Sequence, residues 1–191
     1  MDKRQLLATT ASAALVWLAA GCTTTTERAA QDPSAKRRSI DADVESALAR
    51  LYAQVPSARD LVGKAKGVLV MPSVISAGLG IGGSYGEGAL RVGGGSAGYY
   101  KLASASVGLI AGAQSRAMFV LFMTQPALDR FRASSGWTAG VDASVAVATV
   151  GVNGQIDTKT LQQPVIGFVL TNVGLMANLS LEGARFIKTD F

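Results

Sequence analysis

The chain has 191 residues, of which 49% are hydrophobic and 16% are charged, and its formal net charge is +5. This length and composition suit one globular domain with its own core. Because the chain has no histidine, it lacks the usual general base and the serine–histidine–aspartate triad. Cys22 is the only cysteine, which excludes the common zinc sites. We therefore predict no enzymatic activity, no metal site and no cofactor.

Residues 1–21 are predicted to be a secretory signal peptide. They begin with the basic Lys3 and Arg4, continue with a mostly apolar run over 6–18 and end in small residues. That run is shorter than the about 20 apolar residues that span a bilayer. The segment LAAGC, at 18–22, resembles the lipobox of bacterial lipoproteins, although alanine stands where leucine is usual. The resemblance implies a lipid on Cys22; the alternative is an ordinary signal peptide with an incidental cysteine.

The residue that follows the cysteine is Thr23 rather than aspartate. In the sorting pattern that this resembles, such a residue favours the outer membrane, so we expect an envelope lipoprotein that faces the periplasm. Residues 22–38 are predicted to hold the lipidated cysteine and a polar tether, because 23–38 has no apolar periodicity. The folded domain is then predicted to occupy residues 39–191.

The tether ends in three basic residues, Lys36, Arg37 and Arg38. They either belong to a flexible spacer or attract the phosphate groups of a bilayer. Lys64 and Lys66 lie in the last turn of a predicted helix, where cations favour the helix end. All five residues are candidate contacts for anionic phospholipid.

Three helices are predicted in the domain. The first begins after a cap at Ser39 and has its apolar residues on one face. The second begins with a capping-box-like pair, Ser57 and Asp60, and ends at Gly67. The third is short and lies near 125–133.

The rest of the domain is predicted to form strands. The apolar runs at 67–72, ended by a proline, and at 118–123 predict buried strands, and residues 78–114 alternate around turn glycines at 93–95. Further strands are predicted over 137–187, with turns near 153–154 and 172–174. The fold class is therefore α+β, with a glycine-rich, mostly antiparallel sheet or barrel-like core and two amino-terminal helices.

The stretch GLGIGGSYGEGAL, at 78–90, carries two catalytic spacings. Gly78-x-Gly80-x-x-Gly83 is the spacing of a dinucleotide-binding fingerprint, but the glycines that follow disfavour the helix that such a site requires. The pattern G-x-S-x-G around Ser84 is the spacing of a nucleophile elbow, but its histidine partner is missing. We reject both interpretations.

The same stretch predicts a strand with one bare face. Its even-numbered positions carry almost no side chain: Gly78, Gly80, Gly82, Ser84, Gly86 and Gly88. Because side chains alternate between the faces of a strand and glycine is unfavourable there, a bare face implies close approach by another backbone or by a ligand. Tight sheet packing or barrel curvature is the first interpretation, and a ligand on the bare face is the second.

An ordered set of motifs resembles the SYLF domain, also called the Ysc84-like domain. The motifs are KAKGV at 64–68, the glycines of 77–88, GLIAGAQ at 108–114, FMT at 122–124, DASVA at 142–146 and GLMANLSLEGA at 174–184. The resemblance covers roughly residues 45–187 and implies a non-enzymatic domain that binds membrane lipids. Two segments depart from the family pattern, GYYKL at 98–102 and LTNV at 170–173.

The resemblance and the lipobox together favour a lipid-anchored envelope protein that binds anionic phospholipid or another acidic amphiphile. The alternative is a structural or protein-interaction module of the envelope without a lipid ligand. A hydrolase is disfavoured by the missing histidine. A small outer-membrane barrel, suggested by the terminal Phe191, is disfavoured by the lipobox and the predicted helices. No nucleic-acid partner is predicted, and the sequence identifies no protein partner.

Overall fold

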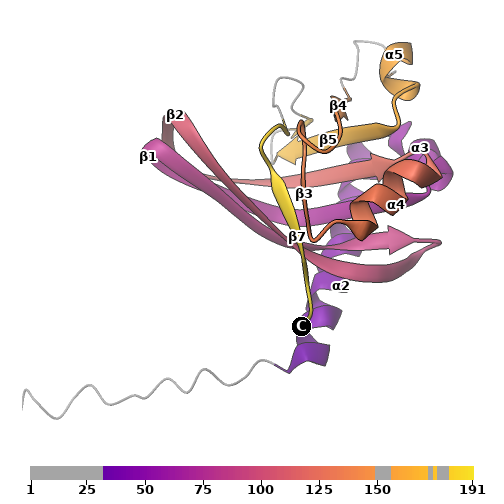
Figure 1. The fold of residues 1–191 in the computed structure, drawn as a ribbon, viewed down its shortest axis with the longest axis horizontal. Helices are drawn as coiled ribbons and strands as arrows, with labels where there is room; N and C mark the ends of the chain where they lie inside the picture. The colour runs from indigo at the N-terminus through magenta and orange to yellow at the C-terminus, as the bar shows by residue number, and fades with distance from the viewer. Residues whose placement is uncertain (1–31, 149–155, 172–173, 176–180) are drawn as a thin grey trace, which may run out of the picture. The chain divides into compact units, whose positions relative to one another are not determined.

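The computed structural model describes residues 32–148, 156–171, 174–175 and 181–191. The chain divides into a first unit, Met1–Asp32, and a compact second unit, Pro33–Phe191, whose fold is shown in Figure 1. The predicted signal peptide and Cys22 lie outside the described residues, as do the predicted turn at 153–154 and most of the one at 172–174.

The second unit confirms the predicted α+β class. Its described helices are α2 (Pro33–Gln54), α3 (Ala58–Lys64), α4 (Gln125–Ala133) and α5 (Thr158–Leu161). They accompany one mostly antiparallel sheet that curls into half a barrel. Helix α4 lies where the third helix was predicted, whereas α5 was not predicted.

A long hairpin forms most of the sheet. Strand β1 (Gly67–Val92) pairs antiparallel with β2 (Gly95–Phe122) along nearly its whole length. The predicted glycine turn joins them, with φ of +59° at Gly93 and +86° at Gly94. Both values are positive, as the tight turn of a two-residue hairpin requires.

The other strands line the two ends of β2. Strand β5 (Val165–Thr171) pairs with residues 117–122, and β7 (Arg185–Thr189) pairs with residues 99–103. Strand β3 (Gly136–Thr138) extends the sheet beyond β7. Strand β4 (Ala146–Val147) lies parallel to β5, and β6 (Gly174–Leu175) pairs antiparallel with it.

Pro72 does not end the first strand, contrary to the prediction. It lies in a register shift between Met71 and Val74, and β1 continues to Val92. Because the ladder is interrupted there, the missing N–H of proline removes no ladder hydrogen bond. The run at 118–123 is likewise the end of β2 rather than a separate strand.

The hairpin folds back on itself at its middle, and the glycine face makes this possible. A Cβ at Gly88 would lie 1.9 Å from the carbonyl oxygen of Val70, and one at Gly86 would lie 2.8 Å from that of Ser73. A Cβ at Gly78 would lie 2.4 Å from the Cα of Gly82. At Gly78, Gly86 and Gly88 the two halves of the strand are therefore in close backbone contact, as the close-packing interpretation expects.

Ser84, the central residue of the rejected elbow, also lies at this contact. Its hydroxyl is 2.7 Å from the hydroxyl of Ser76, which belongs to the other half of the same strand. Ser76 is buried and Ser84 is partly buried, so this hydrogen bond gives the buried hydroxyl a partner inside the fold. Ser84 therefore joins the two layers of the ribbon.

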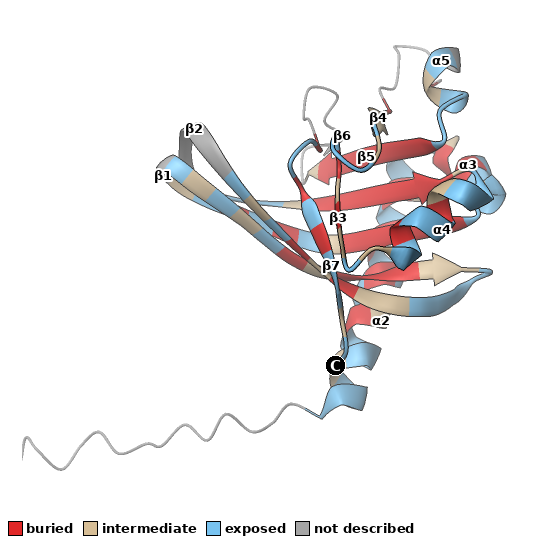
Figure 2. Cartoon of the chain, viewed as in Figure 1, coloured by how far each residue is buried: buried red, intermediate tan, exposed pale blue. Residues whose placement is uncertain are grey.

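Both faces of the sheet are covered near the helices, which explains the continuous apolar runs. On one face, α2 buries Val44, Leu48 and Leu51 against a set that includes Val70, Phe119 and Phe168. On the other face, α4 buries Leu128 and Phe131 against Leu69, Val120, Phe122, Trp137 and Phe186. Figure 2 shows these buried residues in the half of the sheet that lies beside the helices.

Two local predictions at the helix starts were wrong. Helix α2 begins at Pro33, six residues before the predicted cap at Ser39, because proline fits the first turn of a helix. Residues 33–38, assigned to the tether, are therefore helical. Ser57 makes no capping hydrogen bond, and its hydroxyl is buried without a partner within the described structure.

Candidate functional site

The folded-back part of the hairpin extends away from the helices as an arm. We define the arm as residues 75–85 of β1 and 103–115 of β2, seen at the left of Figure 1. The sequence has no charged residue between Lys66 and Glu87, and none between Lys101 and Arg116. The arm is therefore a two-layered ribbon without charge.

Large apolar side chains of the arm are exposed. Ile81 is 76% exposed, Ile75 is 55% exposed and Tyr85 is 51% exposed. Ile81 lies in the reversal itself, because its carbonyl oxygen is close to Gly78. Three such residues on one short element give the arm an apolar character, and gathered exposed apolar residues mark a binding site more often than single ones do.

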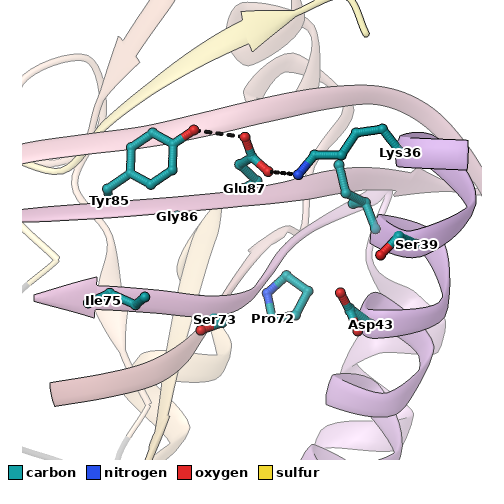
Figure 3. A pocket seen from close by; sticks show the side chains of 10 residues that line it. Lys36, Ser39, Asp43, Pro72, Ser73, Ile75, Tyr85, Gly86 and Glu87 are labelled. Carbon is teal, nitrogen blue, oxygen red and sulfur yellow. Dashed lines mark hydrogen bonds and ion pairs between the residues drawn. The ribbon is translucent and has the colours of Figure 1, made fainter. Parts of the chain in front are cut away.

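A polar cluster occupies the base of the arm, beside the first turns of α2 (Figure 3). The Lys36 Nζ lies 2.5 Å from the Glu87 Oε2, and the Tyr85 hydroxyl donates to the Glu87 Oε1 at 2.7 Å. A cavity of about 190 Å³ opens beside them, lined also by Asp43 and Ile75. The cluster therefore fixes one end of α2 to the base of the arm.

The pKa values at the cluster follow from this geometry. Burial opposes ionisation of Glu87, but hydrogen bonds from Lys36 and Tyr85 outweigh it and lower the pKa of the carboxyl. Burial, together with the hydrogen bond to Glu87, raises the pKa of Tyr85 to about 12. Near neutral pH, Tyr85 therefore keeps its proton, and its hydroxyl donates a hydrogen bond to the ionised Glu87.

The carboxyl terminus lies against the same helix end. Arg37 donates a hydrogen bond to the backbone oxygen of Phe191, and the Lys36 and Lys101 ammonium groups lie 5.8 and 5.1 Å from the centre of its ring. The ring also packs edge-on to Tyr99 at 6.0 Å. Phe191 therefore interacts with basic side chains of the same folded unit.

The structure separates the predicted lipid contacts into two groups. Lys36 and Arg37 are engaged inside the unit, and Arg38 donates to the Ser34 hydroxyl at 3.3 Å. Lys64 and Lys66 are exposed beyond the other end of α2. A helix of 22 residues is about 33 Å long, so the two groups do not form one patch.

Comparison with known families finds one match, which covers the carboxyl-terminal part of the chain. Residues 103–190 match the family model Ysc84, described as a Las17-binding protein actin regulator. Over residues 103–190, the chain is similar to the Ysc84, or SYLF, domain. The match spans the carboxyl-terminal part of the resemblance expected over 45–187. Since β1 pairs with β2 along its length, the preceding strand belongs to the same folded unit as the matched SYLF residues.

A search of curated proteins finds no match to this chain. Among the described residues, no group of three or more acidic, cysteine or histidine side chains is placed to hold a metal ion. Within the same residues, no helix is long and apolar enough to cross a membrane.

Sequence reasoning did not find the cluster at the base of the arm. Lys36 was assigned to a tether and Glu87 was read as part of an alternating strand, and the two are 51 positions apart. The sequence shows only that Tyr85 and Glu87 are two positions apart. In a strand, this spacing places both side chains on the same face.

Proposed function

We propose that this protein is a lipid-anchored envelope protein whose SYLF domain binds lipid without enzymatic chemistry. The observation that carries the proposal is the uncharged arm with Ile75, Ile81 and Tyr85 exposed. Charged side chains oppose entry into the apolar part of a bilayer, and this arm has none. Tyrosine, with an apolar ring and a polar hydroxyl, suits the level of the lipid headgroups.

The glycine face supports the same proposal. It lets two layers of the ribbon pack at backbone contact, so the arm is thin, and the ladder between β1 and β2 pairs the backbone groups on the facing edges of the two strands. Unpaired backbone groups are costly in an apolar medium. In the described structure the outer edges of the two arm strands have no neighbouring strand beyond Ala103, so the uncharged ribbon suits the polar headgroup region, where water and headgroups can bind those edges.

Anionic phospholipid is the proposed ligand, because the chain carries a net charge of +5. A basic residue near an anionic membrane surface contributes about 1 kcal/mol of attraction. Lys64 and Lys66 remain candidates for this contact.

The anchor would be the acylated Cys22, and the location would be the outer membrane, on the periplasmic side. The family description names an actin regulator, but we do not transfer actin binding to a protein of the periplasm.

A protein-interaction module of the envelope is the second candidate function. The family description favours it, since it names binding to a protein, Las17. The exposed apolar residues of the arm would serve a protein partner as well as a lipid. The two functions differ in whether the purified chain binds vesicles.

Vesicle flotation with two matched variants tests the proposal. The chain 23–191, which lacks the predicted signal peptide and Cys22, is mixed with phosphatidylglycerol or phosphatidylcholine vesicles at low salt. We expect Ile81→Asp to reduce flotation with anionic vesicles by about tenfold, since burying an isoleucine contributes about 1.5–3 kcal/mol.

Val141→Asp is the control, because Val141 is 79% exposed and lies outside the arm. It introduces the same charge on a comparably exposed side chain, so we expect flotation to remain at the wild-type level. No flotation of the wild-type chain with either vesicle would contradict lipid binding and favour the protein-interaction module. Equal losses in both variants would show that the arm is not the contact.

A further inference from the structure

A second cavity lies where α2 crosses the sheet, at the end of the arm and apart from Ile75, Ile81 and Tyr85. Its volume is about 170 Å³. The polar lining comes from three elements: Arg50 and Gln54 of α2, Ser115 and Arg116 of β2, and Thr171 of β5. All five of these side chains can donate hydrogen bonds, and no acidic residue lines the cavity.

Arg116 is half-buried in this cavity without a full set of partners. Its Nε is inaccessible to solvent and has no hydrogen-bond partner in the described structure. Its Nη2 lies 3.5 Å from the Ser84 hydroxyl, which is a long contact. Burial lowers the pKa of Arg116. A guanidinium in this position is unfavourable unless a negative group compensates it.

Arg50, the second guanidinium, is also weakly engaged. Its Nη2 lies 3.4 Å from the carbonyl oxygen of Pro72. In the part of the chain that the structure describes, neither Arg50 nor Arg116 forms an ion pair. Arg91, by contrast, has a carboxylate oxygen of Glu45 at 2.5 Å. Two positive charges therefore line one cavity with no acidic partner from the described protein.

The local strand pairing explains why these donors gather there. The register of β1 shifts between Met71 and Val74, so the ladder to β2 is interrupted. On the other side of β2, pairing with β5 ends at Ala117 and Leu170. Arg116 thus lies where β2 has lost its neighbour on one side and approaches the interruption on the other. The cavity is a product of this irregularity, which the sequence marks only by Pro72.

We propose that this cavity binds a phosphate group, either of a lipid headgroup or of a free phosphate ester. Guanidinium forks match the oxygens of a phosphate, and the hydroxyl and amide donors supply further hydrogen bonds from other directions. One water molecule has about 30 Å³ of liquid volume, so the cavity has room for a tetrahedral oxyanion. This proposal stands on the cavity alone and does not require that the arm contacts lipid.

Titration of the full-length chain with inorganic phosphate tests the site. The protein is held in a non-ionic detergent, and calorimetry and thermal unfolding are compared with chloride at matched ionic strength. We expect one phosphate per chain and a higher unfolding temperature, which chloride does not produce. Arg116→Gln and Arg50→Gln should each weaken phosphate binding by about tenfold or more.

Lys159→Gln is the matched control, because it removes the same charge from an exposed position on α5. We expect it to bind phosphate like the wild type. Without phosphate, Arg116→Gln should unfold at the same or a higher temperature, since it removes an unsatisfied buried group. Arg50 is exposed on α2, so Arg50→Gln tests the site even where Arg116→Gln does not fold. No phosphate binding by the wild type, or equal binding by all variants, would overturn the proposal.

Two further probes separate the sources of the phosphate. Much tighter binding of a short-chain phosphatidic acid than of glycerol phosphate would support a lipid headgroup. Equal binding of both would support a free phosphate ester. Ile81→Asp should bind inorganic phosphate like the wild type, so failure of the arm to bind lipid and failure of this site are distinguishable.

Discussion

Glu87 is the residue on which the base of the arm depends. It accepts hydrogen bonds from Tyr85 on its own strand and from Lys36 on α2, so one carboxylate joins two elements. Burial alone would favour the neutral acid, but these two donors hold the pKa below its ordinary value. The ionised form is therefore the one that the fold stabilises.

We expect the stability of the domain to depend on pH through Glu87. A carboxyl whose pKa is lower in the folded than in the unfolded state contributes stability above its unfolded pKa. That contribution is lost as the pH falls through the folded pKa. Glu87→Gln should therefore lose less stability than the wild type on acidification. The difference should be about 1 kcal/mol or less, because the pair is partly exposed.

Urea unfolding of the chain 23–191 at about pH 7 and about pH 3 measures this difference. Asp60→Asn, on the exposed surface of α3, is the control and should follow the wild type. If Glu87→Gln and the wild type lost the same stability between the two pH values, the ion pair would have no measurable role.

The arm differs from the rest of the sheet in how its strands pack. Near the helices, β1 and β2 are buried on both faces. Towards the arm the hairpin folds back, so the second half of β1 packs on the first half of the same strand. The packing of the arm requires glycine on one face only. Its two faces should therefore respond differently to the same substitution.

We predict that Gly88→Ala strongly destabilises the domain and that Gly83→Ala does not. The new Cβ at position 88 would lie 1.9 Å from a backbone oxygen, whereas at position 83 its nearest neighbour would be at 3.5 Å. Overpacking against backbone costs about 1–3 kcal/mol or more, while alanine in an open strand position gains about 0.5–1 kcal/mol over glycine. Denaturant unfolding of both variants measures the effect. Equal midpoints would contradict the layered packing of the folded-back hairpin.

At the scale of the whole second unit, the helices cover the hydrophobic cores, and the arm carries exposed apolar side chains. Helices α2 and α3 cover one face of the sheet and α4 covers the other, so the core is complete without the arm. The arm is then free to carry exposed apolar side chains, because the stability of the unit rests on the cores beside the helices. This division makes the arm the natural place for a contact outside the domain.

Local patterns predicted the parts of the fold that depend on neighbouring residues. The glycines at 93–95 predicted the turn, the apolar runs predicted buried strands, and the even-numbered glycines predicted a close backbone approach. The partner of that approach was not predictable, since alternation shows that a face is bare but not which backbone meets it. The Lys36–Glu87 pair and the Arg50–Arg116 cavity arise from contacts between distant segments, for which the sequence carries no local signal.

Direct measurement of the environment of residue 81 tests the central claim, that the arm enters lipid. The chain 23–191 has no cysteine, so Ile81→Cys gives one site for an environment-sensitive fluorophore, and Val141→Cys gives the matched control. We predict that anionic vesicles shift the emission of the label at position 81 to the blue and that lipid-borne quenchers reduce it, while the label at position 141 does not change. Unchanged emission at position 81 in the presence of vesicles that bind the chain would contradict the claim.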